Sequence, residues 1–168
     1  MALEIRTLGD PVLRENCRVL DGVGPGVNGL VRKMGDAIHA EPGRAGLAAS
    51  QVGVLERLFV YDLGHGVRCF VNPEIVEKEN EYIVEEGCLS IPGIMVPVPR
   101  YYRVVLRCTT LSGHKILFES VGFLAQVFQH ECDHLDGVLI IDRCGDEERR
   151  IALEEYRVMD FQRRQAAL

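Results

Sequence analysis

Apolar side chains recur every three or four positions between residues 27 and 40, which is the period of a helix with one buried face. The residues that carry this pattern are Val27, Leu30, Val31, Met34, Ala37 and Ile38. Ahead of it, Asp10-Pro11 predicts only a short helical turn, because proline fits the first helical position. The first part of the chain therefore supplies one amphipathic helix, which we expect to be scaffold.

Between residues 57 and 120 the pattern changes to runs of β-branched and aromatic residues. Runs at 57–63 and 67–72 flank Gly64-His65-Gly66 and predict a hairpin. Residues 74–84 mix apolar and charged side chains, which predicts extended strands with a polar face. A second hairpin is predicted from runs at 102–110 and 115–120, so His114 is expected in its turn. Between these parts, prolines at 92, 97 and 99 exclude a central strand and favour an irregular or edge path.

The last third of the chain returns to helical spacing. A helix is predicted from about Val121 to Leu135, with Gly137 at a position where helices often end. The wholly apolar run 138–141 predicts a short buried strand or extended segment. From Asp146 onward, a charged helix with one apolar face follows.

Length and composition narrow the class of protein. A chain of 168 residues favours one domain, 1–168, and the absence of an apolar run near 18 residues indicates a soluble protein without a membrane segment. The first residues lack the apolar core of a signal peptide, so we expect the cytoplasm. A net charge of −6 argues against general nucleic-acid binding, and six scattered cysteines are expected to be free thiols.

Residues 128–134, Phe-Gln-His-Glu-Cys-Asp-His, contain the pattern H-E-x-x-H. Residues four apart share one helix face, so His130 and His134 can present two imidazole nitrogens to one metal ion. Glu131 lies beside that pair, where its carboxylate can reach a metal-bound water without being a ligand. Cys132 falls on the opposite side and is expected to pack in the core. The alternative is two histidines that share an amphipathic helix and bind no metal.

A catalytic centre of this kind holds its metal with three protein ligands and leaves one position for water. No histidine follows His134, and Asp136 and Asp142 are the carboxylates near it in sequence. Cys88 is a stronger candidate for the third ligand, because the glycine before it and the prolines after it place its thiol on tight, irregular backbone.

Three stretches resemble the peptide deformylase family, in the same order: 46–51 (GLAASQ), 86–90 (EGCLS) and 129–134 (QHECDH). The resemblance extends over most of the chain. It implies an α+β domain in which antiparallel strands pack around a central metal-binding helix, with a further helix towards each end. It also implies one divalent metal ion bound by Cys88, His130 and His134, usually ferrous iron, which zinc, nickel or cobalt can replace.

The resemblance implies a hydrolase that removes the formyl group from the N-terminal methionine of newly made polypeptides and releases formate. Metal-bound hydroxide would attack the formyl carbon, with Glu131 as general base and then general acid. The Gln51 side-chain amide and the Leu89 backbone N–H would stabilise the developing oxyanion. In similar proteins the last helix can touch the ribosome, and here it carries Arg157, Arg163 and Arg164.

Four residues are expected to contact the substrate. Phe123, Gln126 and Val127 precede His130 on its helix and would form a wall for the methionine side chain, with ordinary core packing as the alternative. Gly46 begins a run of small residues that lets other backbone approach closely. Many members of the family carry glycine where this chain has Arg44, so we expect either a narrower entrance or an altered substrate preference beyond the first residue.

Two other functions use the same residues. A protease that cleaves internal peptide bonds is the first, and a structural metal site in a binding module, closed by a fourth protein ligand, is the second. Asp133 is expected to orient a ligand or neighbouring backbone, unless it is a solvated carboxylate.

Overall fold

The computed structural model describes residues 3–166, so the first and last residues of the predicted domain lie outside the described part. Its helices are α1 (Pro25–His39), α2 (Gly122–Leu135) and α3 (Asp146–Ala166), with short 3-10 turns η1 (Pro11–Arg14), η2 (Ala49–Val52) and η3 (Ile140–Asp142). The strands are β1 (Gly46–Ala48), β2 (Leu58–Tyr61), β3 (Arg68–Cys88), β4 (Ile91–Thr109) and β5 (Lys115–Val121). They pair antiparallel in the order β1-β2-β3-β4-β5. The predicted α+β class and both hairpins are confirmed.

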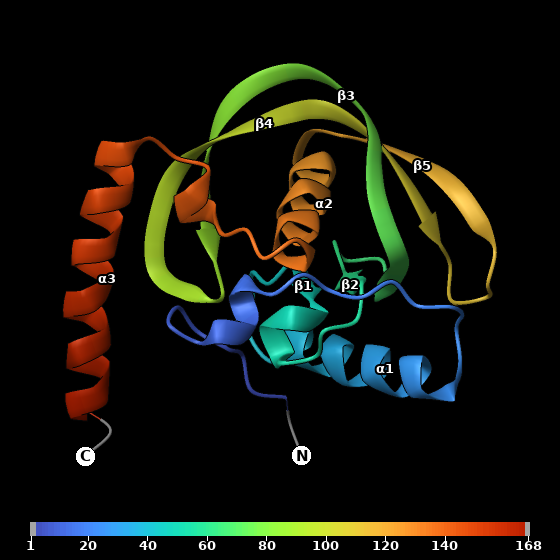
Figure 1. Cartoon of the computed structure of the whole chain (residues 1–168), viewed down its shortest axis with the longest axis horizontal. Helices are drawn as coiled ribbons and strands as arrows, with labels where there is room; N and C mark the ends of the chain where they lie inside the picture. The colour runs from blue at the N-terminus through green and yellow to red at the C-terminus, as the bar shows by residue number, and fades with distance from the viewer. Residues whose placement is uncertain (1–2, 167–168) are drawn as a thin grey trace.

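The long strands β3 and β4 arch over α2, which occupies the centre of the molecule (Figure 1). The helix α1 lies below it, and α3 stands to one side next to β4 (Figure 1). None of the described helices combines the length and apolarity that a membrane crossing requires. This arrangement places the face of α2 that carries the histidines against the ends of β1 and β3.

The apolar face of α2 is anchored by an aromatic cluster. The Phe128 ring centroid lies 5.0 to 5.8 Å from those of Phe59, Tyr61, Phe70 and Phe118. Such pairs stabilise a core beyond the area they bury. Cys132 belongs to the same core cluster, which confirms that it packs away from the histidine face, and all six cysteines are free thiols, as expected.

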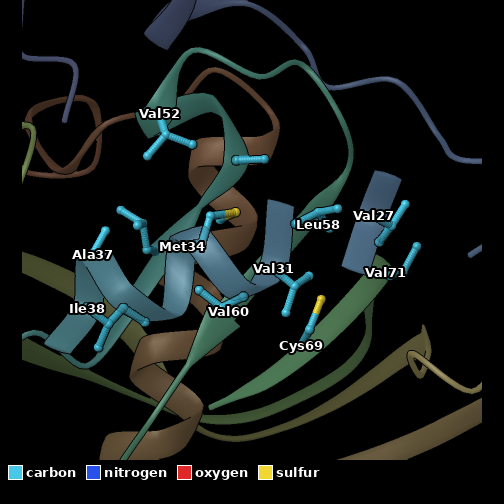
Figure 2. Packing of buried hydrophobic residues seen from close by; sticks show 12 residues of the cluster. Val27, Val31, Met34, Ala37, Ile38, Val52, Leu58, Val60, Cys69 and Val71 are labelled. Carbon is cyan, nitrogen blue, oxygen red and sulfur yellow. The ribbon is translucent and has the colours of Figure 1, made fainter. Parts of the chain in front are cut away.

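The amphipathic helix α1 covers the other part of the sheet. Val31, Met34 and Ile38 are buried in a cluster with residues of β2 and β3, among them Val60 and Cys69 (Figure 2). The helix starts at Pro25, two residues before the predicted start at residue 27. It ends at His39, one residue before the predicted end at residue 40. Its role as scaffold follows from this packing, because none of these side chains lines the cleft described below.

The prediction of an irregular path around residues 92–99 is wrong, because β4 is one continuous strand of 19 residues. The alternative of an edge path is right for this part: β5 pairs with residues 103–109 of β4, so among residues 3–166 the earlier part of β4 has β3 as its only strand partner. Pro97 and Pro99 stand opposite Glu85 and Ile83 of β3. A proline is tolerated there because its missing N–H can face the open side of the strand.

Residues 139–141 of the run 138–141 are buried as predicted and Val138 is half-buried, but the run is not a strand. Ile140 begins the 3-10 turn η3, and the Leu139 N–H donates to the Asp142 side chain at 2.8 Å. Leu139, Ile140 and Ile141 are each at most 2% exposed. Apolar composition predicted the burial, whereas the aspartate that caps the turn decided its conformation.

The extended N-terminal segment holds two loops next to α2. Its Arg6 N–H donates to the Gln51 carbonyl at 2.7 Å, and its Leu8 N–H donates to the Ser90 carbonyl at 2.8 Å. These loops come from η2 and from the turn between β3 and β4. The first residues of the chain therefore fix the position of two segments that lie far apart in sequence.

Replacing Phe128 by alanine would remove the ring on which four other aromatic rings pack. We expect a loss of about 3–5 kcal/mol in the free energy of unfolding, measured by urea denaturation. Phe161→Ala is the matched control, because Phe161 is 64% exposed on α3 and its loss should cost no more than about 0.5 kcal/mol. Equal effects of the two substitutions would contradict this account of the core.

Candidate active site

The three predicted metal ligands converge at one point. Cys88 ends β3, and His130 and His134 lie one turn apart on α2. One ligand atom from each residue lies within 4.8 Å of the other two, and Cys88 Sγ is 3.1 Å from His134 Nε2. The carboxylates near the motif are engaged elsewhere, since Asp136 pairs with Arg57 and Asp142 with Arg14.

The Cys88 thiol of this cluster ionises readily. Burial alone would raise the pKa of the Cys88 thiol, but the positive charges of His134 and His130 and their hydrogen bonds lower it well below its ordinary value. A thiolate is the form of cysteine that binds metal. One thiolate and two imidazoles are a donor set that several first-row metals accept, so the residues fit a single bound ion.

Glu131 lies beside the ligands and outside the set. Desolvation raises the pKa of its carboxyl to about 7, against the charges of His130 and His134. Its Oε2 has no hydrogen-bond partner among residues 3–166. A buried carboxyl with a free oxygen and a pKa near neutrality is suited to take and return a proton.

Gly46 faces this carboxylate from β1. A Cβ at Gly46 would overlap Glu131 Oε1 and come to 3.0 Å from Val127 Cγ1. Only glycine at position 46 therefore leaves the space in which the Glu131 side chain lies. The sequence alone did not indicate this reason for Gly46.

The Gln51 side chain is buried and fixed in orientation. Its Oε1 accepts the Ala48 N–H at 2.9 Å, so its amide nitrogen is directed away from β1. That nitrogen donates to Ser90 Oγ at 3.2 Å and to Cys88 Sγ at 3.8 Å. The predicted amide donor thus stands next to the metal ligands, and Leu89 lines the same cleft. Ser90 is a further polar group here that sequence reasoning missed.

A cleft of about 770 Å³ opens over these residues. The predicted wall residues Phe123, Gln126 and Val127 line it from α2, with Phe123 exposed at the rim and Val127 buried. Arg44 also lines the cleft, but its guanidinium is held by α1: Nη1 donates to the Ala37 carbonyl at 2.7 Å. Its Nη2 forms an ion pair with Glu41 at 3.0 Å.

A buried series of ion pairs, the ion-pair chain, holds the His130 ring at its Nδ1 atom. His130 Nδ1 lies 3.0 Å from Glu86 Oε2, and the Arg100 guanidinium donates to both oxygens of Glu86 at 2.8 and 2.9 Å. Burial would raise the pKa of Glu86, yet these hydrogen bonds and the charges of Arg100 and His130 lower it to about 2. An ionised Glu86 that accepts from Nδ1 leaves Nε2 of His130 free to bind a metal.

Arg100 also connects this chain to Asp133, since its Nη1 donates to Asp133 Oδ2 at 2.7 Å. Asp133 is therefore not a solvated carboxylate. The sequence reading assigned no role to Glu86 or Arg100, although a signal existed: Ile94, Val96 and Val98 alternate as inward positions, and Arg100 continues that alternation. A charge at a buried position of a strand requires a buried partner.

Gln129 is another residue whose role was missed. Its side-chain amide accepts the Tyr101 N–H and donates to the Tyr101 carbonyl, both at 2.9 Å. Tyr101 lies on β4 just before the part that pairs with β5, so the amide takes the place of a neighbouring strand. This contact joins α2 to β4 one residue before His130.

Together, a thiol of lowered pKa, two imidazoles and a glutamate of raised pKa beside a deep cleft define a centre of the metallohydrolase type. Comparison with known proteins agrees with this class. The family model of polypeptide deformylase matches residues 2–150, and the chain belongs to this family. Members of the family remove the formyl group from newly made polypeptides.

Individual relatives cover most of the chain. Peptide deformylase 1 of Clostridium perfringens is 44% identical over 140 residues, which are 82% of this chain and 95% of that protein. The peptide deformylase of Thermotoga neapolitana is 42% identical over 158 residues, 94% of each. The crystal structure of a peptide deformylase from Legionella pneumophila superposes with a TM-score of 0.90 at 33% identity, covering 99% of this chain and 98% of that one.

The donor set predicts one metal ion per chain. Cys88→Ala should reduce the bound metal, measured by elemental analysis after gel filtration, from about one ion to a small fraction, because a three-ligand site loses its thiolate. Cys132→Ala is the control, since that thiol packs on the opposite side of the same helix and its loss should leave the metal content unchanged. Undiminished metal in Cys88→Ala would contradict the assignment.

Proposed function

We propose that this protein acts as one catalytic domain that hydrolyses N-formyl-methionyl peptides to formate and a free N-terminus. The observation that carries the proposal is the position of Glu131, buried beside the Cys88, His130 and His134 ligand set at the floor of a cleft. Membership of the polypeptide deformylase family supports the substrate class.

In the proposed reaction, Cys88, His130 and His134 hold the metal. When bound, the ion supplies a Lewis acid that activates water and polarises the formyl oxygen. Glu131 takes the proton that the water gives up as the new C–O bond forms, and it delivers this proton to the leaving amine when the C–N bond then breaks. The Gln51 amide and the Leu89 N–H donate to the formyl oxygen as its charge develops.

The methionine side chain is assigned to the cleft wall made by Phe123, Gln126 and Val127, and the substrate backbone to the side of Gly46. Support comes from the position of these residues along one cleft, with the α2 wall opposite β1. Val127 and Gly46 are close enough that a Cβ on the glycine would meet the valine.

For the native metal we propose Fe(II), with zinc, nickel or cobalt able to replace it. One thiolate and two imidazoles bind all of these ions, so the donor set is compatible with iron without selecting it. Metal analysis of protein purified without oxygen is the decisive measurement. Iron near one equivalent together with formate release agrees with the proposal, and an active protein that holds zinc alone does not.

Glu131→Gln keeps the shape of the side chain but removes its ability to carry a proton. We expect kcat for formate release from formyl-Met-Ala-Ser to fall about 10²- to 10⁴-fold, while the metal content stays near that of the unaltered protein. Glu85→Gln, an exposed carboxylate at the same cleft, is the control and should change kcat little. Unchanged turnover in Glu131→Gln would refute the mechanism.

The same assay separates the two alternative functions. A protease would release internal peptide fragments instead of formate, and a structural metal site would give no turnover in any variant. Formate as the product, with an intact peptide, excludes both.

We also propose that the protein works in the cytoplasm, with the ribosome as a partner through α3. Its support is that Arg163 and Arg164 are 42% and 78% exposed near the end of a helix of which only Ala152 and Tyr156 are buried. Cosedimentation with ribosomes checks this: Arg163→Glu together with Arg164→Glu should weaken it several-fold at low salt, because nucleic-acid surfaces attract exposed cations. Equal cosedimentation of the unaltered protein and the charge-reversed variant would count against α3 as the ribosome contact.

A further inference from the structure

The buried ion-pair chain behind His130 continues to the molecular surface. Arg143, which directly follows η3, binds the Asp133 carboxylate with a fork: Nη2 is 2.6 Å from Oδ1 and Nε is 3.2 Å from Oδ2. Its side chain is 45% exposed, whereas those of Glu86, Arg100 and Asp133 are 2%, 4% and 11% exposed. This series of ion pairs therefore runs from the exposed Arg143 side chain to His130, a proposed metal ligand.

The guanidinium groups of Arg100 and Arg143 together neutralise the carboxylates of Glu86 and Asp133. Arg100 lies between two buried carboxylates, because it donates to Glu86 through Nε and Nη2 and to Asp133 through Nη1. Asp133 Oδ2 accepts from both arginines. With Arg143 in place, two cations face two carboxylates, and each carboxylate has a bidentate partner, the geometry that holds planar groups most firmly.

Without Arg143, the Asp133 carboxylate would depend on Arg100 alone. A buried carboxylate that loses a charged partner draws more strongly on the one that remains. Arg100 would then be divided between Asp133 and Glu86, and its fork on Glu86 would loosen. Glu86 is the group that fixes the ring of His130 through Nδ1.

From this geometry we propose that Arg143 is a positioning residue for the metal centre, acting on His130 through Asp133, Arg100 and Glu86. The inference rests on the proposed function, in which His130 is a metal ligand. It gives an exposed side chain, outside the cleft, control over how firmly the active-site metal is held.

If Arg143 had a purely structural role, its substitution would have a different effect. Arg143 also ties the segment after η3 to α2, and loss of that tie alone would lower thermal stability without changing the metal environment. The test therefore needs readouts that stability does not move.

We would load the protein with cobalt(II), and measure the visible absorption spectrum and the rate at which EDTA removes the metal. Arg143→Gln should speed cobalt loss about threefold to tenfold and shift the cobalt bands, below the 10- to 100-fold typical of groups that contact a ligand directly. Arg149→Gln is the matched control, because Arg149 is 46% exposed and pairs with Asp142, which takes no part in the series of ion pairs behind His130. It should leave both readouts unchanged.

The path through Glu86 is tested with a double variant. Glu86→Gln should itself speed cobalt loss, and adding Arg143→Gln to it should have no further effect if Arg143 acts through Glu86. Independent, multiplying effects of the two changes would overturn the proposed route.

The outcomes are distinct. Cobalt loss and spectrum like those of the unaltered protein in Arg143→Gln would overturn the proposal, whatever its melting temperature. If that variant cannot be purified, Arg143→Lys, which keeps the charge but not the fork, carries the same comparison with a smaller expected effect. Failure of the unaltered protein to release formate would refute the proposed function and leave the cobalt comparison intact.

Discussion

The pairing of Arg100 with Glu86 and Asp133 is the interaction on which the site depends. Three charges at this depth are unfavourable unless each is matched, so β3, β4 and α2 can close on one another only in the register that brings these groups together. That register also sets Cys88 at the end of β3 opposite the histidines of α2. The proposed metal ligands are therefore placed by a set of charges that lies outside the ligand set.

Neutral contacts complete the placement of α2. The aromatic cluster around Phe128 fixes one face of the helix, and the Gln129 amide binds β4 at the margin of the sheet. Glu131, two residues after Gln129, is held in the narrow space left by Gly46. Aromatic packing, a side-chain hydrogen bond and the absence of a Cβ at Gly46 thus all help to position the residues assigned to the chemistry.

Much of this could be read from the sequence, and the failures have physical causes. Helical spacing located α1 and α2, and H-E-x-x-H with Cys88 predicted three ligands whose side chains the structure brings together, because these depend on local periodicity and on residue chemistry. Prolines at 97 and 99 predicted an irregular or edge path, and only the edge path is right, because β4 is a continuous strand with one side open here. An irregular path has no inward and outward alternation, so it did not indicate the inward position of Arg100 or the role of Glu86. Partnerships between segments many residues apart leave no local pattern to detect.

The hydrogen bonds of the N-terminal segment have a consequence for local stability. Arg6 and Leu8 hold the Gln51 turn and the Ser90 loop, which carry the two donors assigned to the formyl oxygen. A short extended segment at a chain end opens at a lower free energy than the core of the domain. One such opening releases both loops at once, so their amide hydrogens should exchange with solvent as a single unit. The two donors assigned to the formyl oxygen would then share one fluctuation, whereas the amides around His130 and His134, on the central helix α2, should exchange more slowly.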